Sequence, residues 1–404
     1  MTRLPAMPFV PVALMSPSTE LEVKMAEQIF TNAKIVLGDE VVSGTIAINK
    51  GHITDISEGN SSVPQALDMG GDYVMPGLVE LHTDNLEKHM TPRPKTEWPP
   101  IAAAVAHDNQ VASAGITTVF DAIAIGDVHD GSERIRRLND SINSLTEAKE
   151  KNLLRADHLV HLRCEVSYRG MREALDTMSG HKLVKMLSIM DHTPGQRQFV
   201  SLDAYYTYYQ GKYGLTDDQM RSFIEERKED QRQYSIPHRR YVVGTAKELN
   251  LALASHDDAT SEHVAEAVED GITVAEFPTT MEAAKASHEA GLGVMMGGPN
   301  LVRGGSHSGN IAAGDLAKEG YLDIISSDYV PHSLLHGAML LFDDLDDYDL
   351  PRAIRLVSKT PAERVGLTDR GEIAIGKRAD LIHVHHSPHH PVVRGVWREG
   401  IRVS

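Results

Sequence analysis

Short apolar runs that follow helix-like segments recur along the middle of the chain. At four places an amphipathic, helix-like pattern ends at a glycine, and a run typical of a buried strand begins soon after it. A glycine there suits the left-handed backbone position that closes a helix. Repeated helix-to-strand units of this length predict a parallel sheet. The four glycines are Gly115, Gly271, Gly291 and Gly320.

Further apolar runs end near His82, Glu165, Asp191 and His256. About eight strands can be counted in this way, which is enough to close a (β/α)₈ barrel. A doubly wound sheet is the alternative, but no Gly-x-Gly-x-x-Gly turn follows the first strand. The pattern therefore predicts an α/β fold built on a TIM-like barrel.

The two ends of the chain show short alternating stretches that are typical of β strands. Residues 26–75 and 368–404 are predicted to fold together as a small β-sandwich, which leaves residues 76–367 for the barrel. Residues 195–245 are rich in tyrosine and charge, and we expect an insertion over the barrel mouth. Residues 1–25 lack the long apolar core of a signal peptide and are expected to form a disordered extension.

Composition argues against several classes of protein. The chain has 404 residues, of which 41% are hydrophobic, so it can bury a large core. The net charge of −17 argues against a nucleic-acid or membrane-surface protein. No apolar run approaches the ~18 residues that a membrane helix needs. A single cysteine, Cys164, suits a reducing compartment, and we expect a cytoplasmic homo-oligomer, with a dimer as the simplest case.

Ligand-type side chains stand at the ends of the predicted strands. His82 and Asp84 end the first run, and because side chains on a strand alternate faces, both are expected to point the same way. Imidazole nitrogens and carboxylate oxygens placed together can hold a divalent metal. The later strand ends carry Glu165, Asp191 followed by His192, His256 and Asp328.

Several of these residues have a structural alternative. Arg163 lies two residues before Glu165 on the same strand face, so a buried ion pair would explain both. Asp191, rather than His192, could be the inward residue, and Lys185 would then share its face and could be carboxylated.

Glu276 and a run of C-terminal histidines are weaker candidates for metal ligands. Glu276 ends the sixth predicted strand, and a ligand role there is doubtful. The run of histidines from His383 to His390 alternates along a predicted edge strand of the appended domain, which is more typical of surface residues than of a metal site.

Basic side chains gather on three predicted loops at one end of the barrel. One loop follows the first strand, one follows His192, and a glycine-rich loop spans residues 297–310. Glycine amides and basic side chains bind phosphate oxygens, so the loops together predict a small polyphosphate substrate, although any single residue could be a solvated loop charge. The candidates are Lys88, His89, Arg93, Arg197, Arg303 and His307.

Residues 75–85 and 371–381 resemble signature motifs of the amidohydrolase superfamily, whose members are metal-dependent hydrolases built on a barrel. Most members have His-x-His in the first motif, whereas this chain has His-x-Asp. The resemblance implies one or two divalent ions, with zinc expected and iron or manganese as alternatives. It also implies roles for particular residues: His82 and Asp84 on one metal, Glu165 as a bridge, His192 and His256 on a second metal, and Asp328 as a ligand and catalytic proton acceptor.

Six further motifs narrow this resemblance. They resemble a subgroup of diphosphatases that serve carbon–phosphorus bond cleavage, and the match runs from about residue 25 to the C-terminus. This implies hydrolysis of α-D-ribose 1-methylphosphonate 5-triphosphate to the 5-phosphate and pyrophosphate in phosphonate catabolism. The motifs are residues 76–89, 186–198, 254–258, 275–280, 297–300 and 327–329.

Two other functions fit part of the pattern. Hydrolysis of amides, cyclic amides or amines is the commonest chemistry of the superfamily, but such sites need fewer phosphate donors than the three basic loops supply. A non-catalytic barrel scaffold would be expected to have lost its ligands, whereas candidate ligands remain at five strand ends of this chain.

Overall fold

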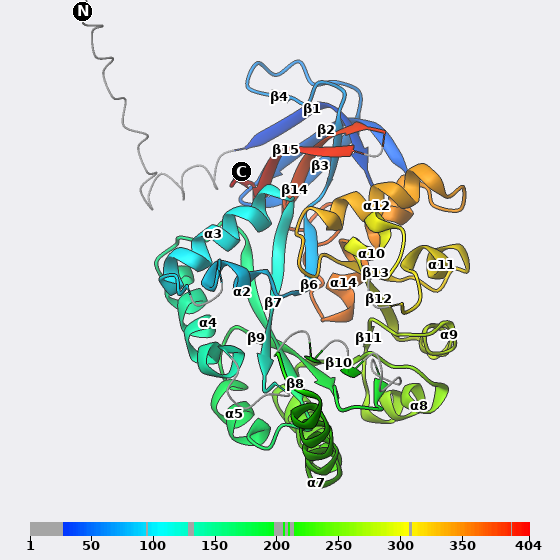
Figure 1. Cartoon of the computed structure of the whole chain (residues 1–404). Helices are drawn as coiled ribbons and strands as arrows, with labels where there is room; N and C mark the ends of the chain where they lie inside the picture. Colours follow the sequence, from blue (N-terminus) through cyan, green and yellow to red (C-terminus); the bar gives the residue numbers. More distant parts are fainter. Residues whose placement is uncertain are drawn as a thin grey trace, which may run out of the picture.

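The computed structural model consists of a barrel and a second sheet that is built from both chain ends (Figure 1). It describes residues 27–93, 96–127, 133–197, 205–206, 209–210, 214–306, 309–388 and 390–404. The extension expected at residues 1–25 lies outside this part of the chain.

Eight parallel strands follow one another in chain order around the nearly closed barrel, which confirms the predicted fold. The four glycines that were expected to close helices all have positive φ, between 78° and 90°. The strands are β6 (Leu78–Thr83), β7 (Ile116–Ile125), β8 (Asp157–Glu165), β9 (Val184–Met190), β10 (Ala252–His256), β11 (Val274–Glu276), β12 (Gly293–Gly297) and β13 (Ile324–Ser326).

Helices surround the barrel and connect its strands (Figure 1). In the described part of the chain, no helix has both the length and the apolar character needed to cross a membrane. The helices are α2 (Asn85–Met90), α3 (Pro100–Ser113), α4 (Glu133–Glu150), α5 (Met171–Met178), α7 (Asp217–Leu249), α8 (Ser261–Asp270), α9 (Met281–Glu289), α10 (Gly298–Arg303), α11 (Ala313–Lys318), α12 (Ser333–Asp344), α13 (Leu350–Arg355) and α14 (Lys359–Arg364).

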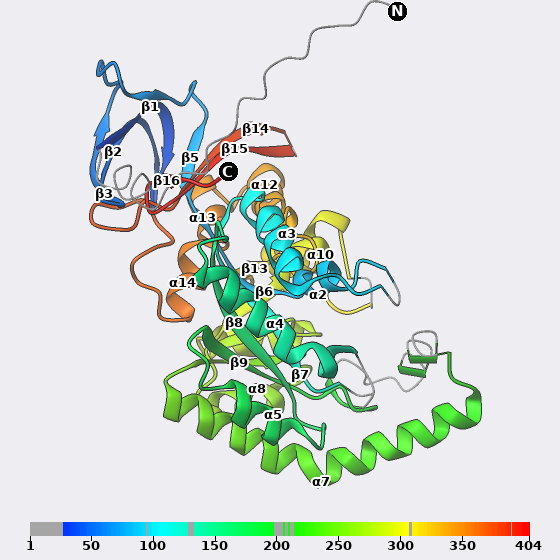
Figure 2. The ribbon, with the colours of Figure 1, turned by 90° about the vertical axis from the view of Figure 1, so that its left-hand side faces the viewer.

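The predicted insertion is dominated by the 33-residue helix α7. Thr216 and Gln219 form a capping box at its start, and Asn250 ends it in the left-handed conformation. The helix packs against β9, β10 and α5 on the outside of the barrel, on the side opposite the terminal sheet (Figure 2). Of the tyrosines that precede it, Tyr209 reaches the barrel mouth.

Strands from both chain ends form one mixed sheet, in the order β16-β15-β14-β5-β1-β2-β3, with β4 beside β1. The predicted β domain is therefore present, but its strands are hydrogen-bonded into a single sheet, because β5 pairs with both β1 and β14. The strands are β1 (Gln28–Val36), β2 (Val41–Asn49), β3 (His52–Glu58), β4 (Leu67–Asp68), β5 (Tyr73–Pro76), β14 (Leu381–Ser387), β15 (His390–Arg398) and β16 (Ile401–Arg402).

The first and last barrel strands meet at a seam that side chains hold together. Between β6 and β13, one parallel bridge joins Thr83 to Asp328. The carboxylate of Glu80 accepts hydrogen bonds from the Ser326 hydroxyl, at 2.7 Å, and from the Ser327 amide. Side-chain hydrogen bonds therefore replace much of the missing backbone ladder, and they fix the two strand ends relative to each other.

The link from α14 to β14 passes through a close backbone contact at Gly371. This residue has a φ of +86°, and a Cβ added to it would lie 2.8 Å from the carbonyl oxygen of Ser358. Gly376, in the same connection, has a φ of +87°, but nothing lies within 4 Å of the corresponding position. The two glycines therefore share a backbone requirement and differ in their surroundings.

We expect Gly371→Ala to destabilise the protein more than Gly376→Ala does. Both alanines bear about 1–2 kcal/mol for the left-handed conformation, whereas only residue 371 adds about 1–3 kcal/mol for overpacking. Thermal unfolding midpoints of the two variants provide the comparison. Equal shifts would show that the close approach at Ser358 has no energetic weight.

Candidate metal centre and active site

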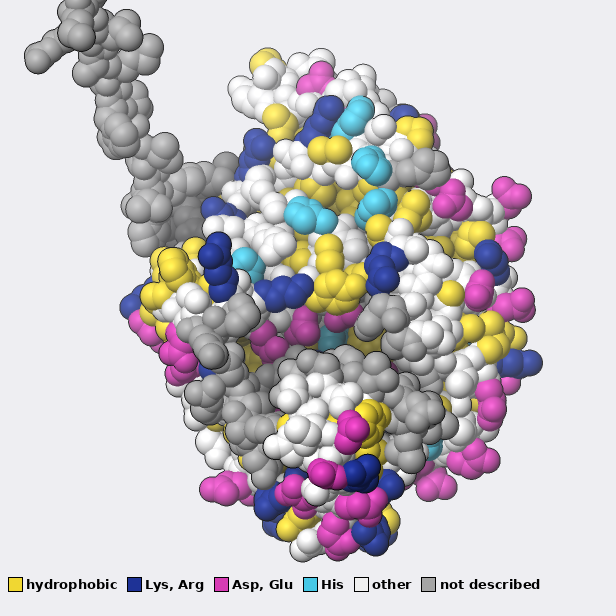
Figure 3. Space-filling view, in the orientation of Figure 1, with side chains coloured by type: hydrophobic (Ala, Val, Ile, Leu, Met, Phe, Trp, Pro, Cys, Tyr) yellow, Lys and Arg dark blue, Asp and Glu magenta, His cyan; other side chains and the backbone are white. Residues whose placement is uncertain are grey.

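A polar pocket opens at the carboxyl ends of the barrel strands, where the sequence predicts the site. Figure 3 shows acidic side chains inside a hollow on this face, with Lys and Arg side chains along its upper rim. The candidates found in its lining are His82, Asp84, His192, His256, Arg303 and Asp328.

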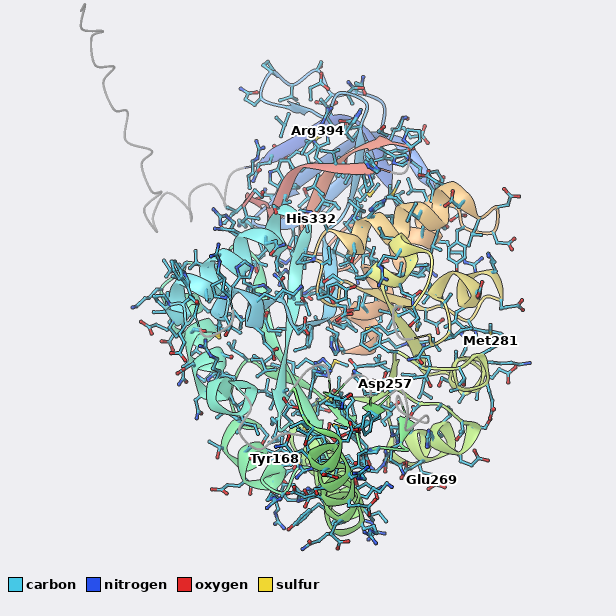
Figure 4. The ribbon with its side chains drawn as sticks, viewed as in Figure 1. Tyr168, Asp257, Glu269, Met281, His332 and Arg394 are labelled. Atoms are coloured by element: carbon cyan, nitrogen blue, oxygen red, sulfur yellow. The ribbon has the colours of Figure 1, made fainter. Side chains whose placement is uncertain are left out.

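His192, His256 and Asp257 bring ligand atoms together at the ends of β9 and β10. Nδ1 of His256 lies 2.8 Å from Oδ2 of Asp257, and Nε2 of His192 lies 3.7 Å from the same oxygen. Both atoms of the shorter contact are buried, yet neither forms a hydrogen bond of acceptable geometry with a described residue. Converging nitrogen and oxygen atoms of this kind suit a divalent cation. Figure 4 shows Asp257 at the centre of the barrel mouth.

Glu165 holds His192 in place. Its Oε2 atom lies 2.6 Å from Nδ1 of His192, and its Oε1 atom accepts hydrogen bonds from the His192 amide and the Ser167 hydroxyl. Burial favours the neutral acid, but the charge of His192 and the hydrogen bonds from His192 and Ser167 together outweigh it and lower the pKa of Glu165. The contact directs Nε2 of His192 toward Asp257, as a carboxylate behind a metal-binding histidine does.

His82 meets Glu276 and His161 inside the barrel. Nδ1 of His82 lies 3.0 Å from Oε1 of Glu276, and Nδ1 of His161 lies 3.7 Å from the same oxygen. Because a carboxylate oxygen accepts, Nδ1 of His82 carries the hydrogen, and Nε2 is the nitrogen suited to a cation. Glu276, at the end of β11, therefore orients the predicted metal ligand His82. The sequence had left the role of Glu276 itself as a ligand in doubt.

Asp84 and Asp328 face the pocket from the two sides of the seam. The β6 register is irregular between Glu80 and Thr83, and Asp84 follows the end of the strand. Asp84 lines the same pocket as His82, as predicted. The alternation of side chains along a regular strand does not explain this position, because Asp84 lies beyond the strand. Burial, together with the charge of Asp84, raises the pKa of Asp328 to about 7.

Backbone strain gathers around the pocket rim. Asp257, Phe277 and Asp328 follow the ends of β10, β11 and β13, and have φ values of 59°, 52° and 52°. Non-glycine residues adopt this region at a cost that surrounding structure must offset, and they cluster at functional sites. The strained turns set the direction of two carboxylates and of the aromatic ring between them.

A second group of buried ligand-type residues is already satisfied by hydrogen bonds. Asp121 lies 2.6 Å from Nε2 of His107 and 2.7 Å from Nδ1 of His158, and Nε2 of His158 lies 3.2 Å from Asp108. Burial opposes charge on His158, but the two carboxylates outweigh it and raise its pKa to about 9. The group is a structural ion network that ends at Asn85, beside Asp84.

A model of the family described as the amidohydrolase family matches residues 101–403. The chain belongs to the amidohydrolase family. It is also 48% identical, over 376 residues, to alpha-D-ribose 1-methylphosphonate 5-triphosphate diphosphatase of Escherichia coli (strain K12). This alignment covers 93% of the chain and 100% of that protein.

Solved structures of other proteins share the fold. N-acetylglucosamine-6-phosphate deacetylase from Pasteurella multocida superposes with a TM-score of 0.62 at 12% identity, over 93% of this chain and 99% of that one. 5-Methylcytosine deaminase from Klebsiella pneumoniae gives a TM-score of 0.61 at 14% identity, over 93% and 98%. These likenesses agree with an amidohydrolase architecture that carries an appended sheet.

The phosphate-binding candidates separate into rim and interior residues. Arg303 lines the pocket at the end of α10. Lys88 is exposed and donates to the Tyr329 carbonyl, at 2.5 Å, beside the pocket. Arg93 is exposed on the loop after α2. His307 lies outside the described residues.

Two of the candidates are engaged elsewhere. Arg197 is buried and forms ion pairs with Asp258 and Glu266. His89, on α2, contacts Gln110 of α3, at 3.0 Å. Neither side chain belongs to the described pocket lining.

The structure also distinguishes between the open alternatives at β9. Asp191 accepts from Ser235 of α7, at 2.9 Å, so its carboxylate faces away from the ligand group. Lys185 is exposed at the start of the strand. His192, rather than Asp191 or a carboxylated Lys185, is therefore the residue of this strand end that joins the site.

The C-terminal histidines contact carboxylates. His383 and His385 lie 3.1 and 2.8 Å from the two oxygens of Asp72, and His386 lies 2.9 Å from Asp343 of α12. None of the three belongs to a candidate metal group in the described part of the chain. They hold the terminal sheet together and attach it to the barrel.

Two site residues, His161 and Asp257, were missed by the sequence reasoning, and Arg163 was considered only as an ion-pair partner of Glu165. His161 shares the strand face of Glu165, and Arg163 lies between them, so the alternation of β8 contained a usable signal for both. Asp257 follows a predicted ligand directly, but its role depends on the left-handed turn after β10, which no sequence pattern indicated.

We expect Glu276→Gln to weaken binding of a divalent cation by about 10–100-fold, because the amide is a poorer acceptor for His82. Titration calorimetry of metal-stripped protein with Zn²⁺ measures the affinity directly. Glu248→Gln, the same change on the exposed surface of α7, serves as the control and should leave the affinity unchanged. Equal affinities in the two variants would reject the orienting role of Glu276.

Proposed function

We propose that the protein hydrolyses α-D-ribose 1-methylphosphonate 5-triphosphate to the 5-phosphate and pyrophosphate. The observation that carries this proposal is the 48% identity to the diphosphatase of Escherichia coli, along the whole length of that protein. The pocket supports it, because cationic side chains stand at the rim of a site that contains candidate metal ligands.

The residues that would hold a cation are His192, His256 and Asp257, with His82, Asp84 and Asp328 nearby in the same pocket. Their nitrogen and oxygen atoms suit one or two divalent ions, with zinc expected and iron or manganese as alternatives. A bound divalent cation lowers the pKa of coordinated water from 15.7 toward about 7.

The chain's own residues supply the remaining chemistry. Asp328 takes a proton from the attacking water, whose oxygen forms a bond to phosphorus. The anhydride bond between the first and second phosphorus atoms breaks, and its electron pair leaves with the departing phosphate oxygen. Arg303 and Lys88 face the charge of the triphosphate from the rim, where neutralising it favours binding and departure of pyrophosphate.

A cytoplasmic location and a homo-oligomeric state are part of the same proposal. Cys164, the chain's single cysteine, is free and buried, which suits a reducing compartment. A dimer stays a prediction, which light scattering of the purified protein can check.

We expect phosphorus NMR to show equal amounts of pyrophosphate and α-D-ribose 1-methylphosphonate 5-phosphate when the metal-loaded protein meets the proposed substrate. Nucleoside triphosphates serve as the comparison, because they share the triphosphate and lack the phosphonate. Release of orthophosphate alone, or turnover restricted to amide or amine substrates, would contradict the proposal.

We expect Asp328→Asn to lower the turnover number by roughly 10²–10⁴-fold, because the amide cannot accept the proton. The cation content after dialysis should stay near that of the wild type, since the other ligands remain. Asp346→Asn, the same change at an exposed position, is the matched control with normal turnover. A fully active Asp328→Asn variant would remove Asp328 from the mechanism.

A further inference from the structure

Arg163 places a guanidinium deep in the pocket. It lies on β8 between His161 and Glu165, and its side chain is 8% exposed. The described pocket lining contains one other arginine, Arg303, which is exposed at the end of α10. Arg163 is therefore the deeper of the two positive charges.

The guanidinium of Arg163 has no anionic partner among the described residues. No carboxylate there forms an ion pair with it, and its Nε atom has no hydrogen-bond partner. Glu165, the partner that the sequence suggested, instead binds His192 and Ser167. A buried arginine keeps its charge and presents five donors, so a position without an anion is unfavourable until one binds.

The contact that remains, to His256, is weak and depends on the tautomer. Nη2 of Arg163 lies 3.4 Å from Nε2 of His256. When Nδ1 of His256, the atom beside Asp257, binds a cation, the ring hydrogen must sit on Nε2. That atom then cannot accept from Arg163, so the loaded site leaves the guanidinium available to a ligand.

The charge of Arg163 also acts on the residues at the site of reaction. Burial and the charge of Asp84 raise the pKa of Asp328, and the charge of Arg163 opposes them. Burial favours the neutral form of Asp257, but nearby positive charges, with that of Arg163 among them, together lower its pKa. The guanidinium lines the same pocket as both carboxylates, and no ion pair joins it to either among the described residues.

We infer that Arg163 is a catalytic residue, whose guanidinium binds the non-bridging oxygens of the phosphoryl group that water attacks. This inference rests on the proposed function. As the new oxygen–phosphorus bond forms and the anhydride bond breaks, Arg163 keeps its protons and stabilises the charge on those oxygens. Its planar donors match phosphate oxygens in pairs, which the ammonium of a lysine cannot reproduce.

The test compares Arg163→Met and Arg163→Lys with the wild type and with Arg232→Met, an exposed arginine of α7. We expect Arg163→Met to lower kcat at least 100-fold and Arg163→Lys to recover only part of it, while Arg232→Met is unaffected. Zn²⁺ affinity of the Arg163→Met variant should not fall, because the change removes a positive charge beside the cation ligands and none of the ligands. The thermal midpoint of Arg163→Met should not fall, because a buried charge without a partner contributes no stability.

The outcomes separate this inference from the proposed function. If the wild type releases pyrophosphate and Arg163→Met does so within threefold of its rate, the inference is overturned and the function stands. If the wild type shows no release, the proposed function fails. Titration with inorganic pyrophosphate then decides the role of Arg163: weaker binding by Arg163→Met supports an oxyanion site, and equal binding overturns it.

Discussion

The closure of the barrel by Glu80 is the interaction on which the site depends. β6 and β13 share little backbone pairing, and the Glu80 carboxylate joins them through Ser326 and Ser327, while the amide of His82, on the same strand as Glu80, helps to hold the carboxylate in place. Burial raises the pKa of this carboxyl group to about 7, even though four hydrogen bonds act against the shift. The seam brings His82 and Asp328, which are far apart in the sequence, to facing sides of one pocket.

Around that seam the site has an ordered arrangement of charge. The carboxylates Glu165 and Glu276 stand behind histidines and orient them, whereas Asp84, Asp257 and Asp328 face the open pocket. Positive charge is arranged by depth, with Arg163 near the floor and basic residues at the rim. An acidic chain can thus accept a polyanion, because cations and buried donors reverse the local sign.

The barrel fold could be predicted from the sequence, because glycine helix caps and apolar strands are local features of the chain. The candidate ligands at the strand ends could also be predicted, because the parallel strands of a barrel all have their carboxyl ends at the same mouth. The sequence did not predict which of these side chains pair with one another. Glu276 contacts His82 from the opposite side, Arg197 turns to Asp258, and His89 turns to Gln110. These pairings depend on how side chains pack and how turns direct them, and the order of residue types along the chain does not indicate either.

The terminal sheet has a consequence for how the chain is made. β5 lies between β1, near the start of the chain, and β14, near its end. While the polypeptide is being synthesised, the edge of β5 must wait for a neighbour until nearly the whole barrel has left the ribosome. Exposed strand edges of this kind recruit other chains. Pairing with β14 therefore completes this sheet only late in synthesis and removes an edge at which another chain could add.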